Sequence, residues 1–235
     1  MNEIRERLEQ RLKRIGQPAN ASPLSEAQKS TVGEAFPESL AGMIDTYGIG
    51  SFFDGLLQMC DPAEFRPILS LVFKADKQLN HKDCHVFAYS AFGYLYVWSK
   101  TYGVVEIDLP AGMVFSQALA PTRFNEAEAT EDEDLSSERN VVGLLPFERD
   151  DVDYSDFHDA PMFDACRASY GQIERGQCYG FFPALALAGT FSPMRSVKNI
   201  KRVKALEHFA ILSQLDTFHL TKLSPDGFEA VRPIG

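Results

Sequence analysis

The residues most able to do chemistry in this 235-residue chain are carboxylates, and they are concentrated in one stretch. Residues 131–134 read EDED, and residues 150–156 read DDVDYSD. Between Glu126 and Asp164, here called the acidic window, there are fourteen acidic and two basic residues, whereas the rest of the chain has 19 acidic and 21 basic ones. The formal net charge of -10 therefore comes from one segment. A surface of this sign repels nucleic acid and attracts basic partners.

Paired carboxylates can act as general acid and base, but only where an apolar pocket raises the pKa of one of them. A run such as EDED is more typical of a solvated surface. Two interpretations of the acidic window stay open at this point. It is either a flexible charged loop that keeps the protein in solution, or a surface that recognises a basic protein.

Metal binding finds weak support in the sequence. Residues 81–85 read HKDCH, which offers zinc ligands, but no second ligand pair lies at a usual spacing. A calcium loop that starts at Asp151 would need Gly and Glu at the positions where Asp156 and Met162 stand. We therefore expect no bound metal and no cofactor.

Nucleophilic catalysis finds little support as well. The chain has no G-x-S-x-G stretch, and its four cysteines form no CxxC pair, although folding could still bring a cysteine and a histidine together. The glycines of GIGSFFDG lack the Lys of a phosphate-binding loop. We expect no catalytic residue and inert, reduced thiols.

The start of the chain and its apolar runs predict a cytoplasmic protein without membrane contact. The first fourteen residues, MNEIRERLEQRLKR, carry charges throughout and contain no apolar signal region. The longest apolar run, FFPALALAGTF, is far shorter than the ~20 residues that span a bilayer.

Helices are expected mainly in the first third of the chain. An N-terminal helix is predicted by apolar residues at near-helical spacing, Ile4, Leu8, Leu12 and Ile15. Residues 17–25 are expected to form a loop, and FPESLAGMIDTYG a helix that ends near Gly48. A further helix is expected to start with Asp61 as its cap, to kink at Pro67, and to end at Phe73.

Strands are expected in the middle of the chain. The stretch HVFAYSAFGYLYVWSK, with a turn at Gly93, and the alternating residues of GVVEIDLP predict an antiparallel meander. Two further helices are expected: one around MFDACRASYG ending at Gly171, and one over VKNIKRVKALEHFAILSQL with Asn199 as its cap. The second would place the five cations of residues 195–204 at a helix start, where the dipole disfavours them and something acidic should compensate.

Two blocks of sequence resemble a known family over roughly residues 30–220. The stretch FPESLAGMIDTYGIGSFFDGLLQMCDPAEFRPIL, followed by HVFAYSAFGYLYVWSK, resembles the GAD-like domain. The stretch MFDACRASYGQIERGQCYGFFPALALAG, continuing into LEHFAILSQL, is similar to the domain that follows it in type VI secretion immunity proteins. The chain departs from the family pattern in its acidic insertion.

The resemblance implies a fold and a domain order. We expect an α+β protein in which a GAD-like lobe with antiparallel strands packs against a C-terminal α+β lobe. The expected divisions are 1–120 for the GAD-like domain, 121–145 for an acidic linker and 146–235 for the C-terminal immunity domain.

The resemblance also implies a function. The family's members bind the toxin that the same cell exports and keep it inactive, and those similar to this chain are paired with DNase toxins. We therefore expect an immunity protein that inhibits a cognate nuclease toxin domain by stoichiometric binding, with no catalytic residue and no direct contact with nucleic acid. The expected partner-binding residues are the acids and aromatics of the window, Glu131, Asp132, Glu133, Asp134, Phe147, Glu148, Asp150, Asp151, Asp153, Tyr154, Asp156 and Phe157.

Two other functions stay open. The first is an enzyme that reverses a toxin's modification, which a carboxyl with a perturbed pKa in a deep pocket, or bound zinc, would favour. The second is a regulatory adaptor whose acidic loop has no part in toxin binding.

Overall fold

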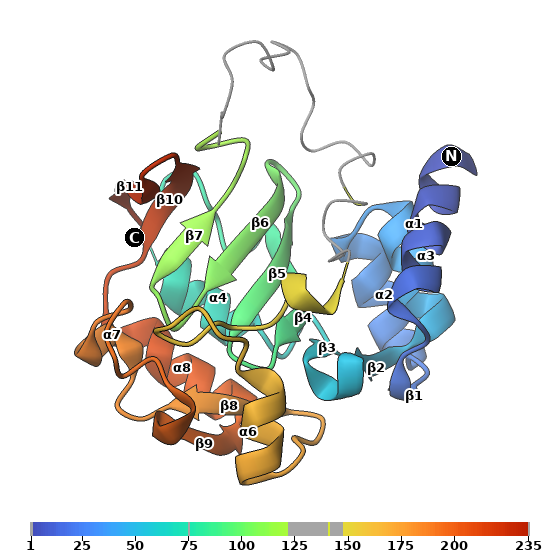
Figure 1. Cartoon of the computed structure of the whole chain (residues 1–235). Helices are drawn as coiled ribbons and strands as arrows, with labels where there is room; N and C mark the ends of the chain where they lie inside the picture. The colour runs from blue at the N-terminus through green and yellow to red at the C-terminus, as the bar shows by residue number, and fades with distance from the viewer. Residues whose placement is uncertain (1, 75, 122–140, 142–147, 235) are drawn as a thin grey trace.

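The computed structural model describes residues 2–74, 76–121, 141 and 148–234, and Figure 1 shows their arrangement. The fold combines helices with a large sheet, so the α+β prediction is confirmed. The helices are α1 (Asn2–Ile15), α2 (Glu26–Ala35), α3 (Glu38–Tyr47), α4 (Arg66–Phe73), α6 (Phe163–Tyr170), α7 (Leu185–Ala188) and α8 (Ala205–Leu215). Short 3-10 helices are η1 (Phe53–Gly55), η4 (Arg149–Asp151) and η5 (Val197–Asn199).

Nine strands of the described chain form one sheet, in the order β1-β2-β3-β4-β5-β6-β7-β10-β11. Their bounds are β1 (Ala19–Ser22), β2 (Ile49–Phe52), β3 (Leu57–Met59), β4 (Cys84–Ser90), β5 (Tyr94–Ser99), β6 (Gly103–Asp108), β7 (Met113–Phe115), β10 (His219–Ser224) and β11 (Gly227–Pro233). Neighbouring strands are antiparallel except β7 and β10, which pair in parallel. The C-terminal strands thus extend the sheet that the first half of the chain builds.

The predicted meander is confirmed in β4, β5 and β6. The turn between β4 and β5 lies at Gly93, whose φ of +94° lies in the left-handed region that favours glycine. An added Cβ there would also approach the ring of Phe209 to 3.1 Å. In β6, Val105 and Ile107 point to the same face and are fully buried.

One face of the sheet, the rear one in Figure 1, is covered by α4 and α8. Side chains of β4, β5 and β6 pack there against Leu69, Phe73 and Phe209, each with 0% exposure. The amphipathic pattern of α4 is strong because Ile68, Leu69, Val72 and Phe73 lie on one side of two helical turns.

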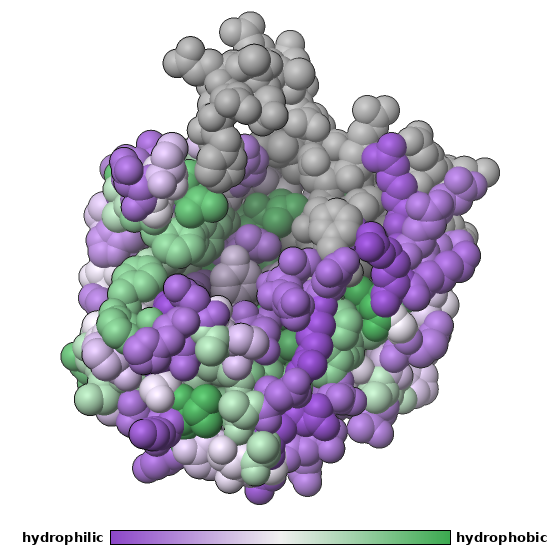
Figure 2. All heavy atoms as spheres, in the orientation of Figure 1, coloured by the Kyte–Doolittle hydropathy of each residue, from purple (hydrophilic) through white to green (hydrophobic). Residues whose placement is uncertain are grey.

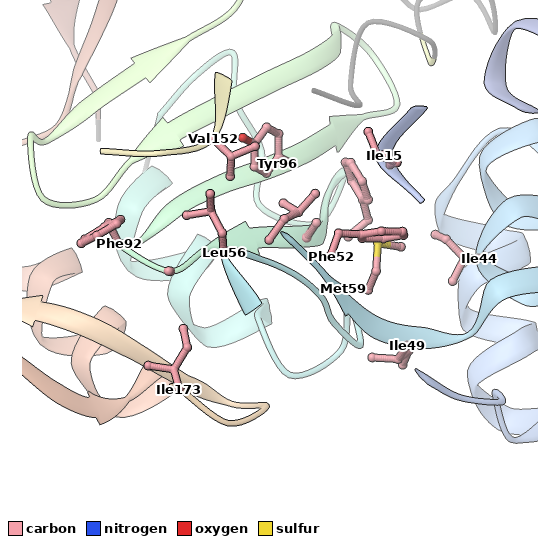
Figure 3. Close-up of a cluster of buried hydrophobic side chains, with 14 of the residues drawn as sticks. Ile15, Ile44, Ile49, Phe52, Leu56, Met59, Phe92, Tyr96, Val152 and Ile173 are labelled. Carbon is pink, nitrogen blue, oxygen red and sulfur yellow. The ribbon is translucent and has the colours of Figure 1, made fainter. Parts of the chain in front are cut away.

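The front face is covered by elements from both ends of the chain. In Figure 3, Ile15 and Ile44 of α1 and α3 approach from one side, Val152 and Ile173 of the C-terminal half lie on the other, and Leu56 lies between them. Leu56 is 0% exposed. The two halves of the chain therefore share one hydrophobic core.

One predicted helix and two predicted helix ends are confirmed. α1 follows the predicted N-terminal helix, with Leu12 and Ile15 buried; the side chains of Ile4 and Leu8 lie outside those described. α3 ends before Gly48, and α6 ends before Gly171.

Two expectations in the first third of the chain are wrong. Residues 19–22 form the edge strand β1 instead of a loop. All four of its residues are exposed, so backbone pairing makes the strand and no period-two apolar pattern announces it. The helix expected from Asp61 begins at Arg66, and Pro67 lies in its first turn without a kink, where the missing N–H needs no partner.

The expected long helix near the C-terminus is also wrong in its first half. β8 (Gln177–Phe181) pairs with β9 (Ile200–Lys204) in a second, two-stranded sheet, and α8 starts only at Ala205. The cations of residues 195–204 therefore lie largely on a strand, and the predicted clash with a helix dipole does not arise. Lys201 lies 4.8 Å from the ring centre of Phe182, and Lys204 pairs with Glu207.

The contact between β8 and α8 gives a stability prediction. A Cβ on Gly180 would lie 2.6 Å from Nε2 of the buried His208 ring, which stacks on Phe182. We expect Gly180→Ala to lower the free energy of unfolding by about 1–3 kcal/mol, because the new methyl group forces the packed ring to shift. Urea denaturation monitored by circular dichroism measures this.

The matched control is Gly42→Ala, which lies on an exposed position of α3 with nothing within 4 Å of the new Cβ. That variant should raise stability by about 0.5–1 kcal/mol, since Ala is the better helix former. A Gly180→Ala protein as stable as the wild type would show that α8 does not pack on β8 in this way.

Candidate functional site

After Val141, the described part of the acidic window is a segment that crosses the front of the sheet, drawn in yellow in Figure 1. We call residues 148–162 the strap. It leads from η4 to the start of α6. Its contacts decide which of the predicted partner-binding residues face the protein and which face solvent.

Tyr154 anchors the middle of the strap. Its ring lies 5.7 Å from that of Phe92 and 5.6 Å from that of Phe181. Its hydroxyl group donates to the carboxylate of Asp108 on β6, at 3.3 Å from Oδ2. Tyr154 is therefore packed into the front core, and its side chain holds the strap against the sheet.

Arg195 fastens the strap from its other side. Its guanidinium donates to the backbone oxygen of Asp156 at 3.0 Å and lies 6.0 Å from the ring centre of Tyr154. Its own backbone oxygen accepts a hydrogen bond from the Phe157 N–H at 2.8 Å. The Phe157 ring remains 42% exposed, so of the two predicted aromatic anchors in the strap it is the one that faces solvent.

Two predicted acidic residues are used within the strap itself. Asp153 accepts hydrogen bonds from the N–H groups of Tyr154 and Phe163, so it satisfies the first turn of α6. Asp156 accepts hydrogen bonds from the N–H groups of Ala160 and His158, which hold the pKa of its carboxyl below its usual range. Both carboxylates therefore stabilise the backbone conformation of the strap and the start of α6.

Three other predicted acids lie on the surface at the start of the strap. Glu148, Asp150 and Asp151 are all exposed. Glu148 accepts a hydrogen bond from the Arg14 guanidinium of α1 at 3.3 Å, and Asp151 accepts one from the Glu148 N–H at 2.9 Å. They form a solvated acidic group beside α1. The remaining predicted residues lie outside those described: Glu131, Asp132, Glu133, Asp134 and Phe147.

Two carboxylates that the sequence analysis did not select lie on the front face of the sheet. Glu106 and Asp108 alternate along β6 with the buried Val105 and Ile107, so both point away from α4. Glu106 accepts a hydrogen bond from the Tyr94 hydroxyl at 3.0 Å. The signal was present in GVVEIDLP, where acids occupy the strand positions opposite the aliphatic ones.

Burial perturbs both of these acids. It raises the pKa of Glu106, although the hydrogen bond from Tyr94 partly offsets the effect. It raises the pKa of Asp108 to about 6, against the hydrogen bonds from the Ala111 N–H and the Tyr154 hydroxyl. Desolvation of the charged form explains the direction for both groups.

Glu106 and Asp108 line a hollow of about 320 Å³ between β6, β7 and β10. Its other walls include Phe115, Leu223 and Phe228. In Figure 2 apolar surface lies over β7, β10 and β11 at the upper left, beside a recess in the front of the molecule. The hollow therefore combines an apolar rim with two acids.

Cys84 and His85 from residues 81–85 pack in the interior. Cys84 and His85 are buried in β4. Nδ1 of His85 lies 3.1 Å from the Arg66 guanidinium, and burial, together with Arg66 and Lys100, lowers the pKa of His85 to about 4. Within the described ranges, no three His, Cys, Asp or Glu residues gather as a metal site would need.

Comparisons with known proteins agree with this architecture. Residues 6–111 match the GAD-like domain, and residues 139–216 match the C-terminal domain of the type VI secretion immunity protein Tdi1. A solved structure, entitled "Crystal structure of Atu4351 from Agrobacterium tumefaciens", superposes with a TM-score of 0.78 at 29% sequence identity and covers 95% of this chain and 96% of its own. The comparison with curated proteins gave no match.

The two domain matches together support a GAD-like type VI secretion immunity protein. The resemblance seen in the sequence is thus confirmed. The divisions at 1–120, 121–145 and 146–235 stay predictions. None of the helices in the described part of the chain has the length and apolar composition that crossing a bilayer requires.

The raised pKa of Asp108 predicts that its contribution to stability decreases as the pH rises. Most acids in folded proteins show the opposite dependence. Between the usual carboxyl pKa near 4 and the folded value of about 6, the folded state binds more protons than the unfolded state. The contribution of Asp108 to stability should therefore fall as the pH rises through this interval. Asp108→Asn cannot ionise, so its stability relative to the wild type should rise from pH 4 to pH 7.

Asp156→Asn is the control, because hydrogen bonds from Ala160 and His158 lower the pKa of Asp156. That variant should be less stable than the wild type at neutral pH, and the difference should shrink as the pH falls below about 4. Urea denaturation of the wild type and both variants, measured from below pH 4 up to pH 7, provides the comparison. A difference between Asp108→Asn and the wild type that does not change with pH would mean that folding does not raise the pKa of Asp108.

Proposed function

We propose that this immunity protein inhibits a nuclease toxin domain by binding it one-to-one, with the acidic window as part of the contact surface. The proposal is supported by the order of the two domain matches. It is also supported by the concentration of fourteen acidic residues within one window of a chain that is otherwise nearly neutral.

The physical argument is one of competition for cations. A nuclease must present basic side chains to a DNA backbone that carries one charge per ~1.7 Å of duplex. Carboxylates on an inhibitor can pair with the same side chains. Long-range attraction would also speed association, to as much as ~10⁸–10⁹ M⁻¹s⁻¹ at low salt. The chain itself, with its net charge of -10, is not proposed to bind DNA.

Different residues of the window serve different parts of this proposal. Glu148, Asp150 and Asp151 are exposed and able to meet basic side chains, and Phe157 offers an exposed aromatic ring at the other end of the strap. The internal hydrogen bonds of Asp153, Tyr154 and Asp156 support a positioning role for these three. Glu131, Asp132, Glu133, Asp134 and Phe147 remain proposed contacts.

The first test is a DNA-cleavage assay with the toxin domain encoded beside this chain. We expect cleavage to stop at one inhibitor per toxin. A variant that replaces five acids of the window by their amides should associate more slowly, with a flatter dependence on salt, because rim charges act chiefly on the association rate. Its substitutions are Glu131→Gln, Asp132→Asn, Glu133→Gln, Asp134→Asn and Asp150→Asn.

A matched control removes five exposed carboxylates elsewhere, so that both variants have the same net charge. Its substitutions are Glu26→Gln, Glu34→Gln, Glu38→Gln, Asp45→Asn and Asp226→Asn. Stopped-flow measurements from low to high salt compare the association rates of the window variant and the control variant with the toxin domain. Equal association rates for both variants would place the interface outside the window. Full DNA cleavage at saturating wild-type protein would show that the protein does not inhibit that toxin.

A second candidate function, an enzyme acting on the toxin, is favoured by one observation. Asp108, with a pKa of about 6, lines a hollow beside the second carboxyl of Glu106, and such pairs can serve as acid and base. Stoichiometry distinguishes the two functions. An enzyme would protect DNA at a small fraction of the toxin concentration, whereas an inhibitor must match it.

A further inference from the structure

The hollow on the front of the sheet has an acidic lining. Its described lining contains the carboxyl groups of Glu106 and Asp108 and no basic side chain. Glu106 accepts a hydrogen bond from the Tyr94 hydroxyl. Asp108 accepts one from the Tyr154 hydroxyl and one from the Ala111 N–H. A carboxylate has about four acceptor positions on its two oxygens, so both groups have acceptor capacity left.

Ser116 supplies a second and independent indication. It lines the same hollow, its side chain is 3% exposed, and its hydroxyl oxygen has no hydrogen-bond partner among the described residues. Buried hydroxyl groups without a partner are uncommon because each costs free energy. A donor that entered the hollow would satisfy the Ser116 oxygen and the two carboxylates together.

The walls of the hollow are aromatic. The rings of Phe115 and Phe228 lie 5.7 Å apart, and Phe228 stacks on Phe191 at 6.3 Å with an interplanar angle of 17°. Phe228 and Phe191 are 51% and 56% exposed. Such large exposed rings beside half-buried acids are expected at a binding surface, where a planar cation can pair with the acids and stack on the rings.

We propose that this hollow receives an arginine side chain of the toxin domain, as a contact separate from the acidic window. Arginine fits better than lysine because its planar guanidinium carries five donors and stacks on aromatic faces. The hollow's volume of about 320 Å³ lies at the small end of ligand pockets, ~300–1,000 Å³, which suits a single side chain. This inference rests on the proposed function, since the toxin supplies the arginine.

The protein's own nearby cation does not fill this role. The charge of Arg195 acts to lower the pKa of Asp108, but its guanidinium donates to the backbone oxygen of Asp156 and lies 5.4 Å from the ring centre of Phe191. It is absent from the lining of the hollow, as are the other basic residues of the described chain.

The test measures binding of the full-length protein to the toxin domain encoded beside it, by surface plasmon resonance. The variant Glu106→Gln/Asp108→Asn should bind the toxin domain at least roughly 30-fold more weakly, mainly through faster dissociation. The reason is that the toxin's arginine would enter the hollow without a carboxylate to pair with its charge. Its matched control is Glu38→Gln/Asp45→Asn on α3, which has the same net charge. A second variant, Phe228→Ala, should weaken binding roughly tenfold, whereas Val231→Ala on the same strand should not.

The outcomes separate this inference from the proposed function. Faster dissociation in both hollow variants, with association rates near that of the wild type and unchanged controls, supports the arginine contact. If the wild type binds and the hollow variants bind equally well, the inference is overturned while inhibition by binding stands. If the wild type does not bind the toxin domain, the proposed function fails and the inference fails with it. Circular dichroism confirms that each variant is folded.

Discussion

The arrangement of the protein follows from strand β4, all seven residues of which are buried. A strand buried on both faces needs a packed layer on each side of the sheet. The rear layer is α4 with α8, and the front layer combines α1, α3 and the strap. Because each layer draws on both ends of the chain, neither the GAD-like part nor the C-terminal part has a complete core by itself.

The front layer stops short of the sheet's far edge. It covers β2 to β5, where Phe52, Tyr96 and Trp98 are at most 5% exposed, but leaves β6, β7 and β10 with partly open side chains. The hollow with Glu106 and Asp108 lies at this uncovered edge. The parallel pairing of β7 with β10 adds Phe228 to its rim. The feature that we assign to partner binding thus results from where the core layer ends.

The acidic window divides into two kinds of residue once the strap is folded. Asp153 and Asp156 bind backbone N–H groups, whereas Glu148, Asp150 and Asp151 remain exposed. A like argument applies to the cations of residues 195–204. Arg195 holds the strap, and the others lie on β9 or near it instead of at a helix start. Charge counted along the sequence therefore overstates the charge that a partner meets.

The sequence by itself determined the meander of β4 to β6 and the ends of α3 and α6, because periodicity and turn residues are local signals. The α+β class and the family followed from the resemblance of two sequence blocks to known domains. It missed β1, whose exposed residues carry no apolar pattern, and β9, whose IKRVK also fits a helical period. Only the tertiary structure decided that Asp108 meets Tyr154 across 46 positions and that Ser116 lines the same hollow. Burial, and the pKa shifts that follow from it, depend on neighbours that are distant in the sequence, which no local pattern contains.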